Sequence, residues 1–106
     1  MLKTALVVDD SKSILSLMRN VLGIAGYNVL TASDGNEGLA VLKSGKQVDI
    51  VITDLNMPNM DGITFIWEIR KLPEHVFTPI CMLTTESEQA KLEEGESISI
   101  DAWINK

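Results

Sequence analysis

The feature that most constrains this chain is the regular alternation of short apolar segments with stretches of helical periodicity. The predicted strands cover residues 5–8, 27–31, 48–53, 80–83 and 102–104. Strands that are apolar on both faces, such as residues 5–8, are typical of parallel sheets covered on both sides. The order βαβαβαβαβ therefore predicts an α/β fold with a doubly wound, five-stranded parallel sheet.

Four helices are predicted between these strands. Apolar residues recur at helical spacing from Ile14 to Ala25, and Gly26 is a typical residue for the end of that helix. Asp34 and Glu37 predict a capping box at the start of a second helix, which residues 44–46 interrupt. The third helix covers residues 63–72 and stops at a proline, and the acidic segment 86–96 is the fourth.

Composition narrows the class of protein. The length of 106 residues suits one domain, and an apolar content of 45% excludes a disordered chain. The net charge of −6 argues against nucleic acid or an anionic membrane as a direct partner. Cys81 is the single cysteine, so no internal disulfide can form, and its apolar neighbours predict a small buried residue. No apolar run approaches a membrane span, and the N-terminus lacks a signal-peptide pattern, so a cytoplasmic protein is expected.

Polar residues follow four of the predicted strands, at the point where each strand ends. They are Asp9 and Asp10, Asp54, Thr84, and Lys106. Ligands of open parallel α/β sheets bind outside the carboxyl ends of the strands, where the strand order reverses. If the first and third strands flank that point, Asp9, Asp10 and Asp54 converge, and their mutual repulsion calls for a cation. Mg²⁺ is the expected cofactor, because it prefers carboxylate oxygens, water and phosphoryl oxygens.

Asp54 then has two possible roles, as a metal ligand and as a nucleophile. Aspartate carboxylates form acyl phosphates in some systems. Phosphoryl transfer depends mainly on positioning and on neutralisation of charge. Lys106 would add positive charge beside the metal, and the Thr84 hydroxyl would donate a hydrogen bond to a phosphoryl oxygen.

With these residues the whole chain resembles the response-regulator receiver domains of bacterial two-component signalling, the CheY-like family. Asp9-Asp10, Asp54 within "ITDLNMPNMDG", Thr84 and Lys106 all stand at the motif positions of that family. The spacings from Asp10 to Asp54 and from Thr84 to Lys106 agree with those of chemotaxis receivers. The resemblance implies the flavodoxin-like strand order 2-1-3-4-5.

The resemblance also implies a function. Asp54 would accept a phosphoryl group from a histidine kinase, and the resulting conformational change would control a downstream output protein or domain. Such a domain is not an ordinary enzyme, although it catalyses its own phosphorylation and dephosphorylation. Asp9, Asp10 and Asp54 would hold Mg²⁺, helped by the backbone carbonyl of Asn56.

Further positions match switch and tuning residues of the family. Thr84 and Trp103 match its hydroxyl and aromatic switch positions, while Asn56 and Glu86 match positions that tune hydrolysis of the phosphoryl group. The stretch "LTTES" and the position of Trp103 resemble stand-alone chemotaxis receivers. The same domain also forms the N-terminal part of longer DNA-binding regulators. The alternative to a stand-alone chemotaxis receiver is therefore the receiver domain of such a regulator.

The chain departs from the family pattern in two places. Ser99-Ile100 stands where the family usually has a small pair such as Gly-Ala. The family also continues beyond Lys106 with a proline and a fifth helix. Residues 1–106 are therefore predicted to be a receiver domain truncated before its C-terminal helix. One face of the sheet would then be poorly covered, which predicts self-association or fraying of the last strand.

Simpler interpretations compete at several of these residues. The competing interpretation of Thr84 is a capping hydroxyl, alone or with Thr85, and that of Trp103 is an ordinary core residue. Lys106 would then be a frayed terminal lysine. His75 is predicted to be a solvated loop residue.

Functions of other classes compete as well. An aspartyl-nucleophile Mg²⁺ phosphatase would place Asp-x-Asp after its first strand, where this chain has Asp-Asp-Ser. An FMN-binding protein would need a phosphate-binding loop there, and Asp9-Asp10 would repel that phosphate. A pseudo-receiver that works without phosphate is disfavoured because every residue of the acceptor site is present.

Overall fold

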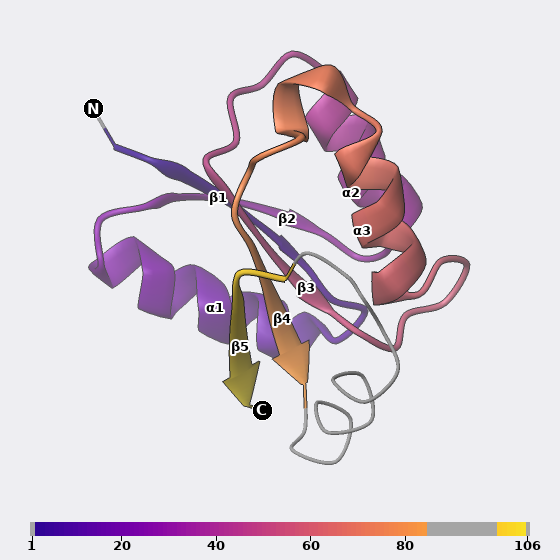
Figure 1. Cartoon of the computed structure of the whole chain (residues 1–106). Coiled ribbons are helices and arrows are strands. Elements are labelled where there is room, and N and C mark those ends of the chain that lie inside the picture. Colours follow the sequence, from indigo (N-terminus) through magenta and orange to yellow (C-terminus); the bar gives the residue numbers. More distant parts are fainter. Residues whose placement is uncertain (1, 85–99, 106) are drawn as a thin grey trace.

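The computed structural model of the chain describes residues 2–84 and 100–105 (Figure 1). Five parallel strands form one sheet in the order β2-β1-β3-β4-β5. Their bounds are Thr4–Val8 for β1, Asn28–Ala32 for β2, Ile50–Asp54 for β3, Ile80–Thr84 for β4 and Ala102–Asn105 for β5. The predicted doubly wound fold and strand order are confirmed.

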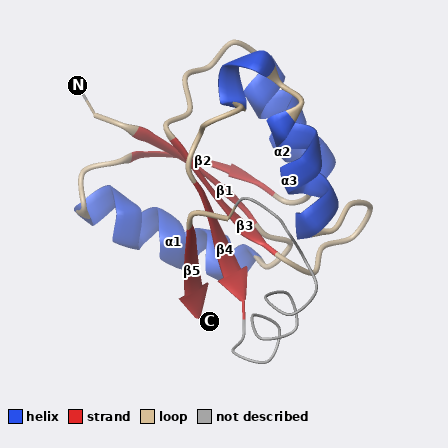
Figure 2. Cartoon of the chain, viewed as in Figure 1, coloured by secondary structure: helices blue, strands red, loops and turns tan. Residues whose placement is uncertain are grey.

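Helices lie on both faces of this sheet (Figure 2). Helix α1 (Lys12–Ile24) covers one face, and helices α2 (Gly35–Lys43) and α3 (Gly62–Arg70) lie side by side on the other. A short 3-10 helix, η1 (Pro73–His75), follows α3. The predicted helix 86–96 lies outside the described residues. In the described part of the chain, no helix has the length and apolar character needed to cross a bilayer.

The sheet separates two hydrophobic clusters. The larger one lies between the sheet and the pair α2 and α3, and Phe65 of α3 is fully buried in it. The smaller one lies beneath α1 and centres on Val7, Ile52 and Leu83. Side chains of β4 alternate between the two, because successive residues of a strand point to opposite faces. Among the described residues, α1 is the only helix over the face of the smaller cluster.

Capping side chains start the three α-helices of the described residues. Ser11, Asp34 and Asp61 each accept a hydrogen bond from the backbone N–H three residues ahead, at 3.3, 2.8 and 2.8 Å. Only half of the predicted capping box forms at α2, since the Glu37 carboxylate accepts a bond from the Ser33 hydroxyl at 2.7 Å. Gly26 has a φ of 96°, which fits its predicted place after the end of α1.

Strand boundaries agree with the predicted ones to within two residues. The third strand begins at Ile50 rather than at residue 48, and it includes Asp54 as its last residue. The register explains this end, because Asp54 still pairs with Leu83 of β4. The site carboxylate is therefore held by the sheet itself rather than by the loop that follows.

The prediction that His75 is a solvated loop residue is wrong. Its side chain is only 5% exposed, and its Nδ1 lies 2.9 Å from the Thr78 hydroxyl in a hydrogen bond. Arg70 at the end of α3 donates to the backbone carbonyls of His75 and Thr78, at 3.1 and 2.6 Å. The turn after α3 is thus folded inward by contacts that no local sequence pattern indicates. Cys81 is partly rather than fully buried, and this burial raises the pKa of its thiol.

Candidate acceptor site

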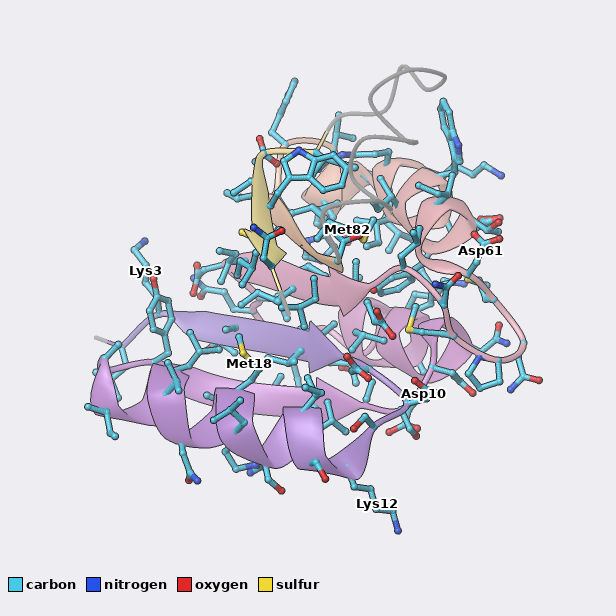
Figure 3. The ribbon with its side chains drawn as sticks, turned by 90° about the horizontal axis from the view of Figure 1, so that it is seen from below. Lys3, Asp10, Lys12, Met18, Asp61 and Met82 are labelled. Atoms are coloured by element: carbon cyan, nitrogen blue, oxygen red, sulfur yellow. The ribbon has the colours of Figure 1, made fainter. Side chains whose placement is uncertain are left out.

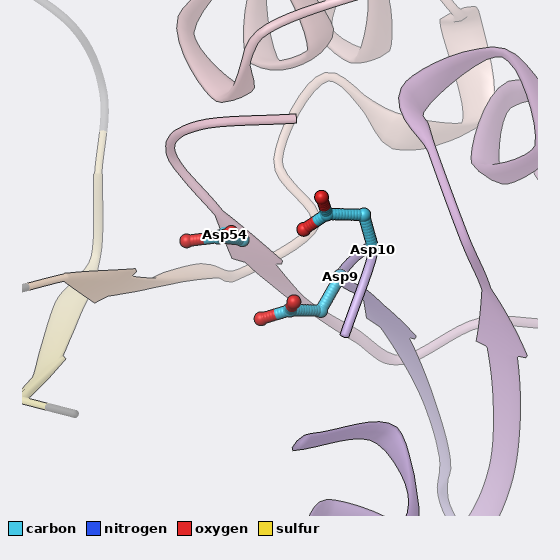
Figure 4. A group of neighbouring side chains, drawn as sticks. All are labelled: Asp9, Asp10 and Asp54. Carbon is cyan, nitrogen blue, oxygen red and sulfur yellow. The ribbon is translucent and has the colours of Figure 1, made fainter. Parts of the chain in front are cut away.

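Three carboxylates meet at the carboxyl ends of β1 and β3. These two strands are neighbours, and Val8 pairs with Thr53, so Asp9 and Asp54 are the next residues along the two strands. Figure 4 shows the side chains of Asp9, Asp10 and Asp54 gathered at this edge. One carboxylate oxygen from each lies within 4.8 Å of the other two. The predicted convergence of the three acids is therefore present in the structure.

The three carboxylates differ in exposure. Asp9 is fully buried, Asp54 is 4% exposed, and Asp10 is exposed to solvent. Backbone amides hold two of them in place: Ser11 N–H donates to Asp9 Oδ1 and Leu55 N–H donates to Asp54 Oδ1, both at 2.9 Å. Burial of negative groups so close together is unfavourable unless a cation compensates them.

This set of oxygen atoms fits a hard divalent cation. Mg²⁺ is held in proteins by one or two carboxylates together with water and phosphate oxygens. Asp9, Asp10 and Asp54 supply such carboxylates, and Asn56, exposed in the loop after β3, carries the backbone carbonyl predicted as a further ligand.

Thr84 ends β4 at the same edge of the sheet and is fully buried. Its neighbour on the other side is Asn105, the last residue of β5, with which it is in register. The structure thus brings Thr84 to the edge that carries Asp54, as the topology predicts. Lys106 and Glu86, and with them the alternative hydroxyl of Thr85, lie outside the described residues.

The predicted switch aromatic Trp103 lies on β5. It is partly buried and packs against the larger hydrophobic cluster, the one that α2 and α3 cover. At this position Trp103 acts as an ordinary core residue. Its role as a switch stays a prediction.

The loop that follows Asp54 depends on residues that the sequence reasoning did not single out. Gly62 is buried, and its N–H donates to the carbonyl of Leu55 at 2.7 Å. A Cβ at this position would overlap the backbone carbonyl of Asp54 and lie 2.9 Å from Leu55 Cα. Only glycine lets the start of α3 approach the backbone of Asp54 so closely. The Asp-Gly pair at the end of "ITDLNMPNMDG" was the available signal.

A second contact anchors the same loop to α2. Asn59 has a φ of 69°, in the left-handed region, and its Nδ2 donates to Asp34 Oδ2 at 3.1 Å. That hydrogen bond also helps to lower the pKa of the Asp34 carboxyl, after the larger effect of the Glu37 backbone N–H.

Known proteins are similar to this chain in sequence. The family model described as "Response regulator receiver domain" matches residues 5–106. The alkaline phosphatase synthesis transcriptional regulatory protein PhoP of Bacillus subtilis is 36% identical over 104 residues, which are 98% of this chain and 42% of that protein. The chain therefore spans about two fifths of the length of this regulator.

Solved structures agree closely with the fold. The chemotaxis response regulator CheY4 of Vibrio cholerae superimposes with a TM-score of 0.92 at 40% identity, covering 100% of this chain and 88% of that one. The response regulator TrrA of Thermotoga maritima, solved in complex with Mg²⁺ and BeF, gives a TM-score of 0.84 at 33% identity, covering 99% and 87%. Motif residues, strand order and these matches together show that the chain belongs to the response regulator receiver domain family.

Proposed function

We propose that this chain is a phosphorylation-dependent receiver in which Asp54 accepts a phosphoryl group from a histidine kinase in the presence of Mg²⁺. The observation that carries the proposal is the convergence of Asp9, Asp10 and the nearly buried Asp54 within 4.8 Å. Carboxylates crowded in this way are poorly suited to a purely structural role, because they repel one another without a cation.

Asp54 is the residue of this set best placed to act as the nucleophile. It lies on a strand in the middle of the sheet, and the Leu55 N–H fixes the orientation of its carboxylate. A carboxylate oxygen would attack the phosphorus of the phosphohistidine, forming an acyl phosphate. The phosphorus–nitrogen bond would break, and the released imidazole nitrogen of the kinase would take up a proton.

The other residues would position and stabilise the group that is transferred. Asp9 and Asp10, with the Asn56 carbonyl, would hold Mg²⁺, which supplies positive charge to the phosphoryl oxygens when it is bound. The Thr84 hydroxyl would donate a hydrogen bond to a phosphoryl oxygen, and the Lys106 ammonium group would pair with another. Asn56 and Glu86 would tune hydrolysis, and because Asn56 is small and uncharged the phosphoryl group should be short-lived.

The phosphorylated domain would control a downstream partner in the cytoplasm. Similarity to CheY4 supports a chemotaxis type of output, and similarity to PhoP supports an output through a DNA-binding domain elsewhere in a longer chain. In either case Thr84 and Trp103 would carry the change from the acceptor site to the β4 and β5 side of the sheet.

Intact-protein mass spectrometry after incubation with Mg²⁺ and acetyl phosphate tests the proposal. One phosphoryl group per chain is expected on the wild type and none on Asp54→Asn. Asp61→Asn is the matched control, because asparagine still caps α3 and should accept the group as the wild type does. Equal uptake by Asp54→Asn and the wild type would show that Asp54 is not the acceptor.

A further inference from the structure

Two aspartates at the opposite edge of the sheet make the same arrangement with a neighbouring strand. Asp49 directly precedes β3, its N–H donates to the carbonyl of Thr4 at 2.8 Å, and its Oδ2 accepts from the Thr4 N–H at 2.7 Å. Asp101 directly precedes β5, its N–H donates to the carbonyl of Ile80 at 2.9 Å, and its Oδ2 accepts from the Ile80 N–H at 2.8 Å. Each aspartate thus holds both backbone groups of the first residue of the adjacent strand. We call these two contacts the Asp49 clasp and the Asp101 clasp.

Additional side chains hold each carboxylate in position. Gln47 donates to Asp49 Oδ1 at 3.0 Å. Arg70 approaches Asp101 Oδ2 at 3.4 Å, while its other terminal nitrogen donates to the backbone carbonyls of His75 and Thr78. The Asp101 clasp is therefore connected to the end of α3 and to the turn after it, which contains the buried residues His75 and Thr78.

The two clasps lie on the two strand pairs that form the two halves of the acceptor site. The Asp49 clasp joins β3 to β1, the strands that lead to Asp54 and Asp9. The Asp101 clasp joins β5 to β4, the strands that end with Asn105 and Thr84 in register. Figure 3 shows Lys3, which precedes Thr4, and Asp10 at opposite ends of β1.

Strand register would connect each clasp to the acceptor site, which lies at the other end of the same strands. The five residue-to-residue steps of extended chain from Thr4 to Asp9 span about 16 Å, at about 3.3 Å per step. A slip of one residue would move a strand end by about 3.3 Å and turn its side chains to the other face. Each of these two strand pairs contains only four ladder positions, so a two-way contact at its start is a large share of what defines the register.

We propose that Asp49 and Asp101 are positioning residues of the acceptor site, each of which sets the register of the strand pair that carries one half of it. This inference deepens the proposed function. Its phosphoryl-uptake measurement depends on that function, whereas its Mg²⁺-binding measurement does not. It assigns different consequences to the two clasps: Asp49 governs the metal half, and Asp101 governs the half that contains Thr84.

The test compares Asp49→Ala and Asp101→Ala with the wild type, at a temperature where circular dichroism shows all three folded. Mg²⁺ affinity is measured by calorimetry and phosphoryl uptake from acetyl phosphate by mass spectrometry. Asp49→Ala should weaken Mg²⁺ binding by about tenfold to 100-fold, the range found when residues that orient metal ligands are removed. Asp101→Ala should keep the wild-type Mg²⁺ affinity and slow uptake by a factor in the same range.

Control variants separate positioning from general destabilisation and from loss of charge. Glu74→Ala removes an exposed carboxylate from η1, after α3, and should change neither measurement. Asp49→Asn and Asp101→Asn keep an uncharged acceptor oxygen, so they should recover most of the function that the alanine variants lose.

Wild-type Mg²⁺ affinity in Asp49→Ala, or wild-type uptake in Asp101→Ala, would overturn the proposal for that residue. An equal loss of Mg²⁺ affinity and of phosphoryl uptake in both alanine variants would also overturn the proposal, because general destabilisation would produce that result. If the wild type takes up no phosphoryl group, the proposed function fails on its own. Mg²⁺ binding and cross-strand nuclear Overhauser effects between β1 and β3, and between β4 and β5, then still decide whether the clasps set the register.

Discussion

Asn59 donates a hydrogen bond from Nδ2 to Asp34 Oδ2 over 3.1 Å, and this contact joins the loop after Asp54 to the N-cap of α2. The two residues are 25 positions apart in the sequence. Asn59 is also the single non-glycine residue with a positive φ in the described part of the chain. The loop beside the candidate acceptor is therefore held by one residue that supplies both a conformation and a bond.

Replacing Asn59 separates these two contributions. Asn59→Gly loses the hydrogen bond but keeps the left-handed conformation, whereas Asn59→Ala loses both. Asn59→Ala should be less stable than Asn59→Gly by about 1 kcal/mol, because a side chain with a Cβ pays about 1–2 kcal/mol in this region. Urea unfolding followed by circular dichroism measures the difference. Equal stability of the two variants would show that the backbone conformation at this position contributes nothing.

Gly62 should tolerate no larger residue. Gly62→Ala places a Cβ against the Asp54 carbonyl and Leu55, so it should destabilise the fold by about 1–3 kcal/mol, as overpacking does elsewhere. It should also slow phosphoryl uptake, because the backbone of Asp54 must move. Gly23→Ala is the matched control: nothing lies within 4 Å of its added Cβ, and a helical alanine should stabilise α1 by about 0.5–1 kcal/mol. A Gly62→Ala variant as stable as the wild type would contradict the close approach.

Stability should fall in acid through Asp34 and Asp49. Backbone N–H groups lower the pKa of both carboxyls below the ordinary value of 3.8: that of Glu37 acts on Asp34, and that of Thr4 acts on Asp49. A group whose pKa is lower in the folded state stabilises the fold above its unfolded pKa, and this contribution disappears as the pH falls through the folded pKa. The free energy of unfolding should therefore decrease below a pH of about 4.

The variants Asp34→Asn and Asp49→Asn show whether these two carboxyls cause the acid sensitivity. Each removes one titrating group, so the stability of each variant should depend less steeply on pH below about 4 than that of the wild type. Urea titrations between neutral pH and pH 3 give the two slopes. Parallel curves for the wild type and both variants would assign the acid sensitivity to other groups.

Helix α1 should support self-association through an exposed apolar stripe formed by Leu17, Val21 and Ile24. These side chains are 55%, 51% and 89% exposed, and their spacing places them on one side of the helix. Arg19 donates to the Thr31 hydroxyl of β2 at 3.1 Å, so the stripe faces away from β2, toward the half of the sheet with β4 and β5. Ile104 of β5 is exposed as well.

Substitution of the stripe should therefore reduce association between copies of the chain. Leu17→Gln with Ile24→Gln should lower the weight-average mass in sedimentation experiments relative to the wild type. Phe77→Gln is the control, because Phe77 is 94% exposed in the loop before β4, away from α1. A strictly monomeric wild type, or a loss of association in the Phe77 variant alone, would contradict the role of the stripe.

The sequence by itself determined the parallel α/β class and the place of the acidic site, and the resemblance to receiver domains supplied the strand order. Apolar runs that alternate with helical periodicity predict a parallel, doubly wound sheet, and parallel strands all end at the same edge. Asp9, Asp10, Asp54 and Thr84 follow or end such runs, so their meeting is a consequence of the topology. Local patterns are sufficient to predict these positions, because the residues that identify each strand and each helix lie close together in the sequence.

Tertiary structure alone decided how that edge is held in place. The clasps of Asp49 and Asp101, the burial of His75, the bond from Asn59 to Asp34 and the close approach of Gly62 join residues that no periodicity relates. A polar side chain before a strand looks the same in the sequence whether it meets water or a neighbouring backbone. Which of the two it meets depends on the strand placed beside it, and that placement exists only after the sheet has formed.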